Sequence, residues 1–416
     1  MLKLLSKWWM IPAAGLLAWA AWSGPLPFLG LLLLFGLVVM SGETPLHSYL
    51  AAFAYYAVVS IDVPHAFSTY INAELVQPEP FVRVAGWAIW FLAAAFLASF
   101  WAVAKWLAIY LSNKGVPFSY AFATFVTLFV TAGPVVGWIH WAHPLLASGV
   151  ILPGFGWISV LFTALVIAFY AEVPRVSLGR DKWLAAHALL AGAIVFSNIH
   201  VQDKISPLRL MGKVYAVQSH DGNPGSYEVY QRRLHALRKI LNEVNASKAS
   251  VIILTPEGYG RRAPKVLIAA LLWPRLDELK AQGSILLLGV SRPHPQMGSE
   301  IDAYGAVEGV IYRNRIQPPA DYLFTIGTEY GAGIIDPDHS PIVRLKGDHV
   351  FMAICFESFL MNHLMAALSE GVKPDYMLVS SNVWMIRGRS AFRINRLSIE
   401  MMSRILGVPY RWAYNV

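Results

Sequence analysis

Long apolar runs with almost no charge fill the first half of the chain, and most charged residues lie beyond position 200. Several runs are shorter than the ~20 residues that an α-helix needs to cross a bilayer, so their ends are predicted only to within several residues. We expect the first run to be an uncleaved anchor, because no small-residue cleavage site follows it. The pattern predicts a transmembrane domain over residues 1–200 with about seven helices: Trp8–Trp22, Leu26–Met40, Leu46–Ile61, Val84–Ala104, Phe118–Ile139, Trp157–Ala171 and Trp183–Ile199.

The second half has a different pattern, in which short apolar runs alternate with amphipathic segments. Buried strands are predicted at 213–218, 251–254, 285–290, 309–312, 350–354 and 376–380, and helices at 226–244, 267–281, 359–368 and 392–406. Such alternation is typical of layered α/β domains. The sequence therefore predicts a second, α/β domain over residues 205–416.

The composition agrees with this division. Hydrophobic residues make up 56% of the chain and the mean hydropathy is +0.49, which is more than a soluble domain needs. The formal net charge is +8, but no run of lysine or arginine is interleaved with aromatic residues, so we do not expect a nucleic acid partner. No charge falls in the middle of a predicted span, which argues against a transporter.

Basic residues indicate which side of the membrane each loop occupies. Loops rich in lysine and arginine stay in the cytoplasm. With the N-terminus inside and seven spans, the α/β domain lies on the far side of a bacterial inner membrane, in the periplasm; six or eight spans would leave it in the cytoplasm. The inside segments would then carry Lys3, Lys7, Lys105, Lys114, Arg175, Arg180 and Lys182.

Three predicted strands of the α/β domain end in residues that can do chemistry. Glu257 follows the second strand, Arg313 and Arg315 follow the fourth, and Cys355, the only cysteine, ends the fifth. A thiol beside a carboxylate base and a cation is suited to nucleophilic acyl transfer. Structural alternatives stay open for each: a core position for Cys355, a helix N-terminal carboxylate for Glu257, and a surface or phosphate-facing charge for Arg313.

A pair of histidines, His140 and His143, lies near the edge of a predicted span. A metal pair is one interpretation, but no third ligand or HExxH pattern accompanies it, so we favour interfacial histidines. We expect neither a metal nor a cofactor.

Four motifs occur together in the order found in one protein superfamily: Thr255-Pro256-Glu257, the segment Tyr312–Pro318, Ile354-Cys355-Phe356-Glu357 and Ser381-Asn382-Val383-Trp384. The chain in this respect resembles the nitrilase (carbon–nitrogen hydrolase) superfamily. With its multi-span first half it is similar to the apolipoprotein N-acyltransferases and, more closely, to the conjugal-transfer TraB proteins of transmissible plasmids.

The resemblance implies a four-layer α-β-β-α sandwich and a Glu-Lys-Cys catalytic set. It makes Glu257 the general base, Cys355 the nucleophile and Glu357 a second carboxylate, and it places Asp321 where the acyltransferases have a glutamate. Asn382, in the fourth motif, is a supporting residue.

The chain departs from the family pattern at the lysine, which is replaced by Arg313. Arg315, Lys265 or Lys346 are the candidates to replace its charge. The chain also ends at Val416, where the family usually continues with further strands, so the sandwich is expected to close differently.

Three functions follow from the resemblance. The first is an inner-membrane acyltransferase of conjugal transfer, which takes an acyl group from a membrane lipid as a Cys355 thioester and passes it to an amine on an envelope or pilus protein. The second is an amidase-type hydrolase with the same residues. The third is a non-enzymatic assembly factor of the conjugation apparatus. The sequence does not determine an oligomeric state.

Overall fold

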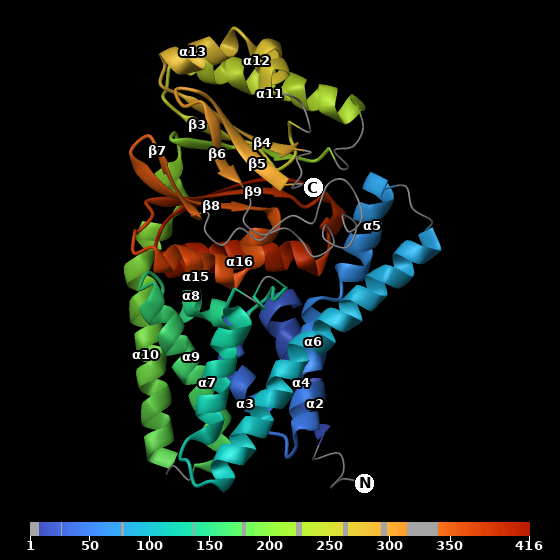
Figure 1. The fold of residues 1–416 in the computed structure, drawn as a ribbon. Coiled ribbons are helices and arrows are strands. Elements are labelled where there is room, and N and C mark those ends of the chain that lie inside the picture. The colour runs from blue at the N-terminus through green and yellow to red at the C-terminus, as the bar shows by residue number, and fades with distance from the viewer. Residues whose placement is uncertain are drawn as a thin grey trace.

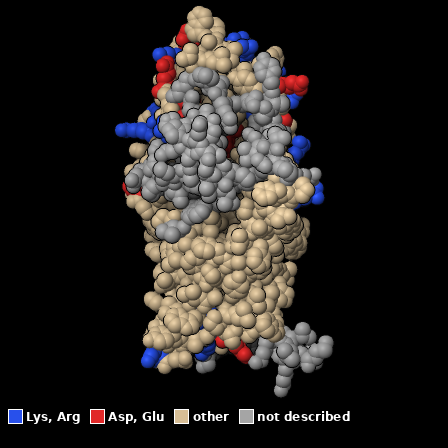
Figure 2. Space-filling model, turned by 45° about the vertical axis from the view of Figure 1, so that its right-hand side comes forward, with Lys and Arg blue, Asp and Glu red and all other residues tan. Residues whose placement is uncertain are grey.

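The computed structural model describes residues 8–25, 27–75, 79–134, 136–137, 139–176, 180–221, 227–260, 265–292, 298–313 and 340–416. The N-terminal part of the chain forms a helical half, and the C-terminal part forms an α/β half that lies against one end of it (Figure 1). Between the charged ends of the molecule, the face seen in Figure 2 has a broad band over the helical half without lysine, arginine, aspartate or glutamate. Such a band is what the hydrocarbon core of a bilayer requires.

The helical half consists of long apolar helices and several short ones. Prolines and glycines set many of the boundaries; Pro45, for example, opens α4 behind the N-cap Thr44, whose hydroxyl accepts a hydrogen bond from the His47 amide. The elements are α2 (Met10–Ala18), η1 (Trp19–Ser23), η2 (Leu29–Leu34), α3 (Phe35–Met40), α4 (Pro45–Val59), α5 (Val63–Leu75), α6 (Glu79–Asn113), α7 (Ser119–Ala132), η3 (Pro144–Ala147), α8 (Ser148–Ile151), α9 (Trp157–Glu172), η4 (Val173–Arg175) and α10 (Arg180–Ile205).

Among the described residues, three helices are long and apolar enough to cross a membrane: Pro80–Asn113, Trp157–Arg175 and Leu184–Leu210. A fourth span results if Pro45–Val59 and Val63–Tyr70, which meet at a 46° bend, are counted as one. The sequence predicts about seven. The other three predicted spans, near residues 8–22, 26–40 and 118–139, contain shorter apolar helices of 10–17 residues, because glycine and proline end them early.

The α/β half contains two five-stranded mixed sheets, ordered β1-β3-β4-β5-β6 and β2-β10-β9-β8-β7. In the first sheet β1, β3 and β4 are parallel to one another, and β5 runs antiparallel to both of its neighbours, β4 and β6. In the second sheet β2, β10, β9 and β8 are parallel to one another, and β7 runs antiparallel to β8. The strands are β1 (Val214–Ala216), β2 (Gln218–Ser219), β3 (Ile252–Leu254), β4 (Ile285–Arg292), β5 (Gly298–Gly305), β6 (Gly309–Arg313), β7 (Ile342–Leu345), β8 (Asp348–Ile354), β9 (Tyr376–Asn382) and β10 (Tyr410–Asn415).

Helices cover the outer faces of the two sheets (Figure 1). The helices are α11 (Tyr227–Ser247), α12 (Lys265–Leu272) and α13 (Arg275–Ala281) on the first sheet, and α15 (Met361–Ser369) and α16 (Ser390–Leu406) on the second, with short turns η5 (Pro207–Leu210), η6 (Cys355–Phe359) and η7 (Trp384–Ile386). Neighbouring strand residues point to opposite faces. Leu254 and Leu287 therefore pack against Met352 and Leu378 between the sheets.

The second sheet contacts the helical half through α15 and α16. Phe351 and Val379 point to this outer face and belong to one continuous apolar core with α15, α16 and the helical half. The ends of β3 and β9 are also tied together, because the Ser380 hydroxyl donates to the Thr255 carbonyl over 2.9 Å. Residues at these strand ends are thereby held next to one another.

Candidate active site

Cys355 occupies a sharp turn where β8 passes directly into η6. Its φ is +46°, a left-handed conformation that costs a non-glycine residue about 1–2 kcal/mol. Hydrogen bonds hold the turn. The Ile354 amide donates to Glu357 Oε2 over 2.9 Å, and the Ser358 hydroxyl donates to the Cys355 carbonyl over 2.6 Å. The strain projects the thiol from the strand end in a fixed direction.

The Glu257 carboxylate lies beside this thiol. It accepts hydrogen bonds from the Cys355 thiol, the Ser299 hydroxyl and the Asn382 amide. Burial raises the pKa of Glu257, and the hydrogen bonds from these donors limit the increase because they stabilise the ionised carboxylate. A carboxylate with a raised pKa is a better proton acceptor for a thiol near neutral pH than an ordinary glutamate. The sequence analysis paired these two residues as base and nucleophile, and the structure brings them into contact.

The backbone around Glu257 explains why it reaches the thiol. Thr255 Oγ1 accepts from the Gly289 amide over 3.0 Å, and the Gly260 amide donates to the Gly289 carbonyl over 2.9 Å. A Cβ atom at Gly289 would lie 2.3 Å from the Pro256 carbonyl oxygen. Only glycine lets β4 run this close, so Gly289 fixes the turn that carries the carboxylate.

Glu357 is fully buried beneath the cysteine turn. Its Oε2 accepts from the Tyr312 hydroxyl over 2.9 Å as well as from the Ile354 amide. His363 Nε2 lies 4.0 Å from the same oxygen and donates to the Met352 carbonyl over 2.8 Å. The carboxylate thus connects β6, β8 and α15 below Cys355.

Asn382 borders the pair through its backbone. Its amide donates to Glu257, and its carbonyl oxygen is 3.8 Å from Cys355 Sγ. Its side-chain oxygen accepts from Asn415 Nδ2 over 3.0 Å, and the Ser219 hydroxyl donates to Asn415 Oδ1 over 2.8 Å. This chain of amides holds the end of β9 against β10 and β2.

Arg313, at the position of the family lysine, forms an ion pair at the end of β6. Its side chain is 66% exposed and its Nε lies 2.8 Å from Glu300 Oε1. The preceding residue, Tyr312, points between the sheets, so Arg313 points to the opposite face of β6. The structure therefore does not turn Arg313 toward the Cys355–Glu257 pair.

The other candidates for this charge differ in what the structure describes. Arg315 and Asp321 lie outside the described residues, and so does the side chain of Lys265. Lys346 Nζ donates to the Ser250 hydroxyl over 2.6 Å. Because Lys346 precedes the seven-residue strand β8 and Cys355 follows it, they are separated by roughly 20 Å. Lys346 therefore cannot act on the thiol.

Several residues that build the site are not apparent from the sequence. Ser299 lies on β5, a strand that was not predicted, and its hydroxyl contacts Glu257. Tyr312 and His363 surround Glu357. A tyrosine or histidine in an apolar run carries no sequence signal of such a contact.

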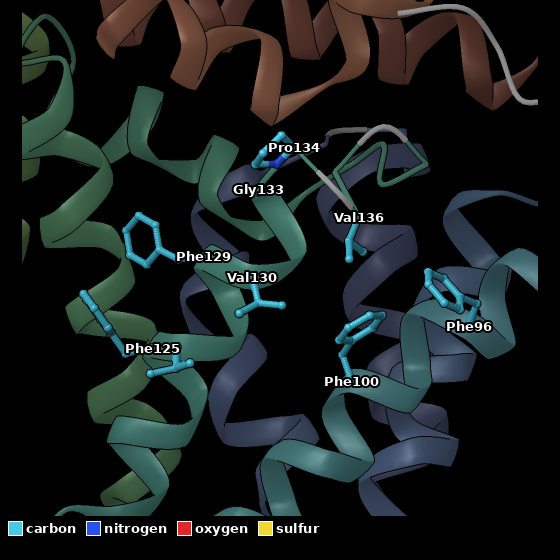
Figure 3. A pocket seen from close by; sticks show the side chains of 9 residues that line it. Phe96, Phe100, Phe125, Phe129, Val130, Gly133, Pro134 and Val136 are labelled. Carbon is cyan, nitrogen blue, oxygen red and sulfur yellow. The ribbon is translucent and has the colours of Figure 1, made fainter. Parts of the chain in front are cut away.

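An apolar groove opens on the helical half between α6 and α7, with a volume of about 700 Å³ (Figure 3). Its end at Pro134 lies nearest the helices of the α/β half (Figure 3). A few residues further along the chain, Trp141 forms a β-bridge with Leu360, and its ring centroid is 5.3 Å from that of Phe359 in η6. The segment that follows the groove lining in sequence therefore contacts η6. The groove is lined by Phe96, Phe100, Phe125, Val126, Phe129, Val130, Gly133, Pro134 and Val136.

His140 and His143 are fully buried. His143 Nε2 and the Thr131 hydroxyl are 3.1 Å apart, and His140 Nδ1 donates to the Thr131 carbonyl over 3.2 Å. Within the described ranges, no three His, Cys, Asp or Glu side chains come together as a metal site.

No protein-family model matches the chain. It is 23% identical over 288 residues to the conjugal transfer protein TraB of Agrobacterium fabrum, a match that covers 68% of this chain and 64% of that protein, less than two thirds of its length. It is 22% identical over 306 residues to the probable conjugal transfer protein TraB of Sinorhizobium fredii, covering 72% of this chain and 73% of that protein. The chain is a distant homologue of these two proteins.

Proposed function

We propose that this protein is a membrane-embedded acyltransferase of the nitrilase type that acts in plasmid conjugal transfer. The observation that carries the proposal is the contact between the Cys355 thiol and the Glu257 carboxylate at adjoining strand ends of the two sheets. The helix–sheet–sheet–helix order of the α/β half supports the nitrilase assignment (Figure 1). The distant homology to TraB proteins supports the proposed role in plasmid conjugal transfer.

The chemistry needs two acyl transfers. In the first, Cys355 Sγ attacks the carbonyl carbon of a lipid ester, and its proton passes to Glu257. The carbon–oxygen bond breaks, Glu257 returns the proton to the leaving alcohol, and a thioester remains on Cys355. In the second, an amine attacks the thioester carbonyl carbon and Glu257 takes a proton from the amine. The carbon–sulfur bond breaks, an amide is released, and the proton on Glu257 passes to the departing thiolate and restores the thiol.

The acyl donor is proposed to be a membrane lipid. The groove between α6 and α7 is lined by apolar side chains, lies on a helix long enough to cross the bilayer, and ends near the segment that contacts η6. An acyl chain in such a groove leaves no polar group of the protein unsatisfied. A soluble nitrile or amide substrate would not need an apolar groove on the membrane-facing helices. The acceptor is proposed to be an amine on an envelope or pilus protein.

The proposed location is a bacterial inner membrane with the α/β half in the periplasm. The α6–α7 and α9–α10 connections lie at the end of the bundle opposite the α/β half (Figure 1). These connections contain Lys114 and Arg175. Basic residues of this kind mark the cytoplasmic side.

The test is mass spectrometry of the purified full-length protein. Cys355 is the only cysteine, so a hydroxylamine-labile acyl adduct reports on it alone. An adduct in the native protein that is absent from Cys355→Ala supports the proposal, and a folded native protein that never carries one contradicts it. Adding an amine acceptor separates the transferase from an amidase-type hydrolase, which releases a free acid with or without the amine.

One observation favours a second candidate, the non-enzymatic assembly factor. The residue at the position of the family lysine is exposed and ion-paired with Glu300, as expected of a site that has lost its catalytic cation. This candidate requires that Cys355→Ala leave plasmid transfer unchanged while deletion of the α/β half abolishes it.

A further inference from the structure

Helix α16 is attached to the helical half at both ends. Asp62, at the bend between α4 and α5, accepts from the Ser390 hydroxyl over 2.5 Å and from the Ala391 amide over 2.9 Å, so a residue of the helical half caps the first turn of α16. At the other end, the Gly154 amide donates to the Arg404 carbonyl over 2.6 Å, and Arg404 Nε donates to the Gly149 carbonyl over 2.6 Å. The position of α16 is therefore set by the helical half.

The same helix is connected to the cysteine turn by two consecutive hydrogen bonds. Asn395, in the middle of α16, donates from Nδ2 to the Ser358 hydroxyl over 2.7 Å. Ser358 in turn donates to the Cys355 carbonyl over 2.6 Å. Asn395 and Ser358 are both fully buried, so water does not compete for these bonds, and each is worth more than it would be on the surface.

The Cys355 carbonyl is a sensitive place for such a connection. A residue with a φ of +46° keeps this conformation only when its surroundings over-determine it. The orientation of its carbonyl is coupled through the peptide geometry to the direction of the side chain. Loss of the Ser358 bond would let the turn relax and would move the thiol away from Glu257.

We propose that Asn395 and Ser358 are positioning residues for Cys355, and that through them the seating of α16 on the membrane helices sets the alignment of the thiol with Glu257. The inference rests on the proposed function in that it takes Cys355 as the reacting group. It assigns to the membrane half a part in forming the site, in addition to anchoring it.

The experiment is the rate of Cys355 alkylation by iodoacetamide, measured against pH in the full-length protein in detergent. An ordinary thiol has a pKa of ~8.5. Because Glu257 takes the thiol proton as general base, alkylation of an aligned Cys355 is expected to follow the ionisation of Glu257 and to have its inflection below that value. Asn395→Ala and Ser358→Ala are each expected to slow alkylation at neutral pH by about tenfold and to move the inflection toward that of an ordinary thiol.

Two near-isosteric variants keep the test independent of folding. Asn395→Asp replaces the donor by an acceptor, which draws the Ser358 hydroxyl away from the Cys355 carbonyl, and it is expected to act like Asn395→Ala. Ser358→Thr keeps the hydroxyl and is expected to retain the native profile. Ser398→Ala is the matched control, because Ser398 is equally buried in α16 and is not part of this connection.

The outcomes separate this inference from the proposed function. Native alkylation profiles in folded Asn395→Asp and Asn395→Ala would overturn the positioning role. A reduction of the alkylation rate in Ser398→Ala equal to that in Asn395→Ala would also overturn it. Iodoacetamide needs no acyl donor. A protein that shows the expected profiles but never carries an acyl adduct would therefore retain the positioning role and refute acyl transfer.

Discussion

The Cys355 thiol donates a hydrogen bond to the Glu257 carboxylate, although the two residues belong to different sheets. Glu257 follows β3 in the first sheet and Cys355 follows β8 in the second. The bond from Ser380 to the Thr255 carbonyl fixes the two sheets to each other near this contact. The reacting pair therefore depends on how the sheets pack.

Glu257→Gln should remove the proton acceptor while it keeps the shape of the side chain. Loss of a general base typically lowers a rate by about 10²–10⁴-fold, and we expect a reduction of this order in acyl loading of Cys355. The readout is the rate of adduct formation by mass spectrometry. An adduct that forms at the native rate would show that Glu257 is not the base.

The same variant should become more stable than the native protein near neutral pH. Burial raises the pKa of Glu257, so the folded state holds this proton more tightly than the unfolded state. The buried carboxylate then costs stability as pH rises from the ordinary glutamate pKa through the raised one, and the cost is absent below both. Thermal unfolding at neutral and at acid pH checks this: the advantage of Glu257→Gln should disappear in acid.

The strand ends were the predictable part of the site. Buried apolar runs that stop at Glu257 and Cys355 predict two strand ends with reactive side chains, and the structure brings these residues together. The direction of Arg313 could not be predicted. It depends on a shift of register between β5 and β6 at Ile301 and Asp302, and such a bulge changes which side chains face inward.

Features that depend on partners distant in sequence could also not be predicted. β10 has the polar sequence Tyr410–Asn415, yet it lies inside the second sheet between β2 and β9, so the chain supplies a strand that the sequence analysis did not predict. Lys105, which the charge pattern predicts to lie in a cytoplasmic loop, is fully buried within the long helix α6. Its Nζ donates to the Met40 carbonyl over 2.8 Å and lies 4.6 Å from the centre of the Tyr120 ring. Partners so far away in sequence leave no local pattern.

Tyr312→Phe should destabilise the α/β half by about 1–3 kcal/mol, because it leaves a buried carboxylate without one of its donors. The hydroxyl that is lost donates to the fully buried Glu357. Tyr215→Phe is the control, since Tyr215 is 49% exposed. Equal melting temperatures for the two variants would show that Tyr312 does not stabilise the turn.

Asp62→Ala should weaken the seating of the α/β half on the membrane helices. It removes the cap of α16, a loss that typically costs about 0.5–2 kcal/mol. Glu308→Ala is the contrasting variant, because the pair of Glu308 with Lys280 is exposed on both sides and should contribute little. Thermal unfolding and limited proteolysis near residue 390 give the comparison, and a larger effect from Glu308→Ala would contradict the role of Asp62.

Val130→Trp should block the groove between α6 and α7 without touching the cysteine turn. Val130 lines the groove, and an indole in its place occupies the space that we assign to an acyl chain. We expect the Cys355 acyl adduct to fall by about tenfold or more, since misplaced substrates lose rate steeply, while alkylation by iodoacetamide stays native. Leu165→Trp is the matched control, because Leu165 is an exposed apolar residue of α9 outside the groove lining. If both variants lose the adduct equally, the effect is general to the helical bundle and the groove is not the acyl site. If Val130→Trp also slows alkylation, the substitution has disturbed the cysteine turn, and the assignment of the groove to the acyl chain fails for that reason.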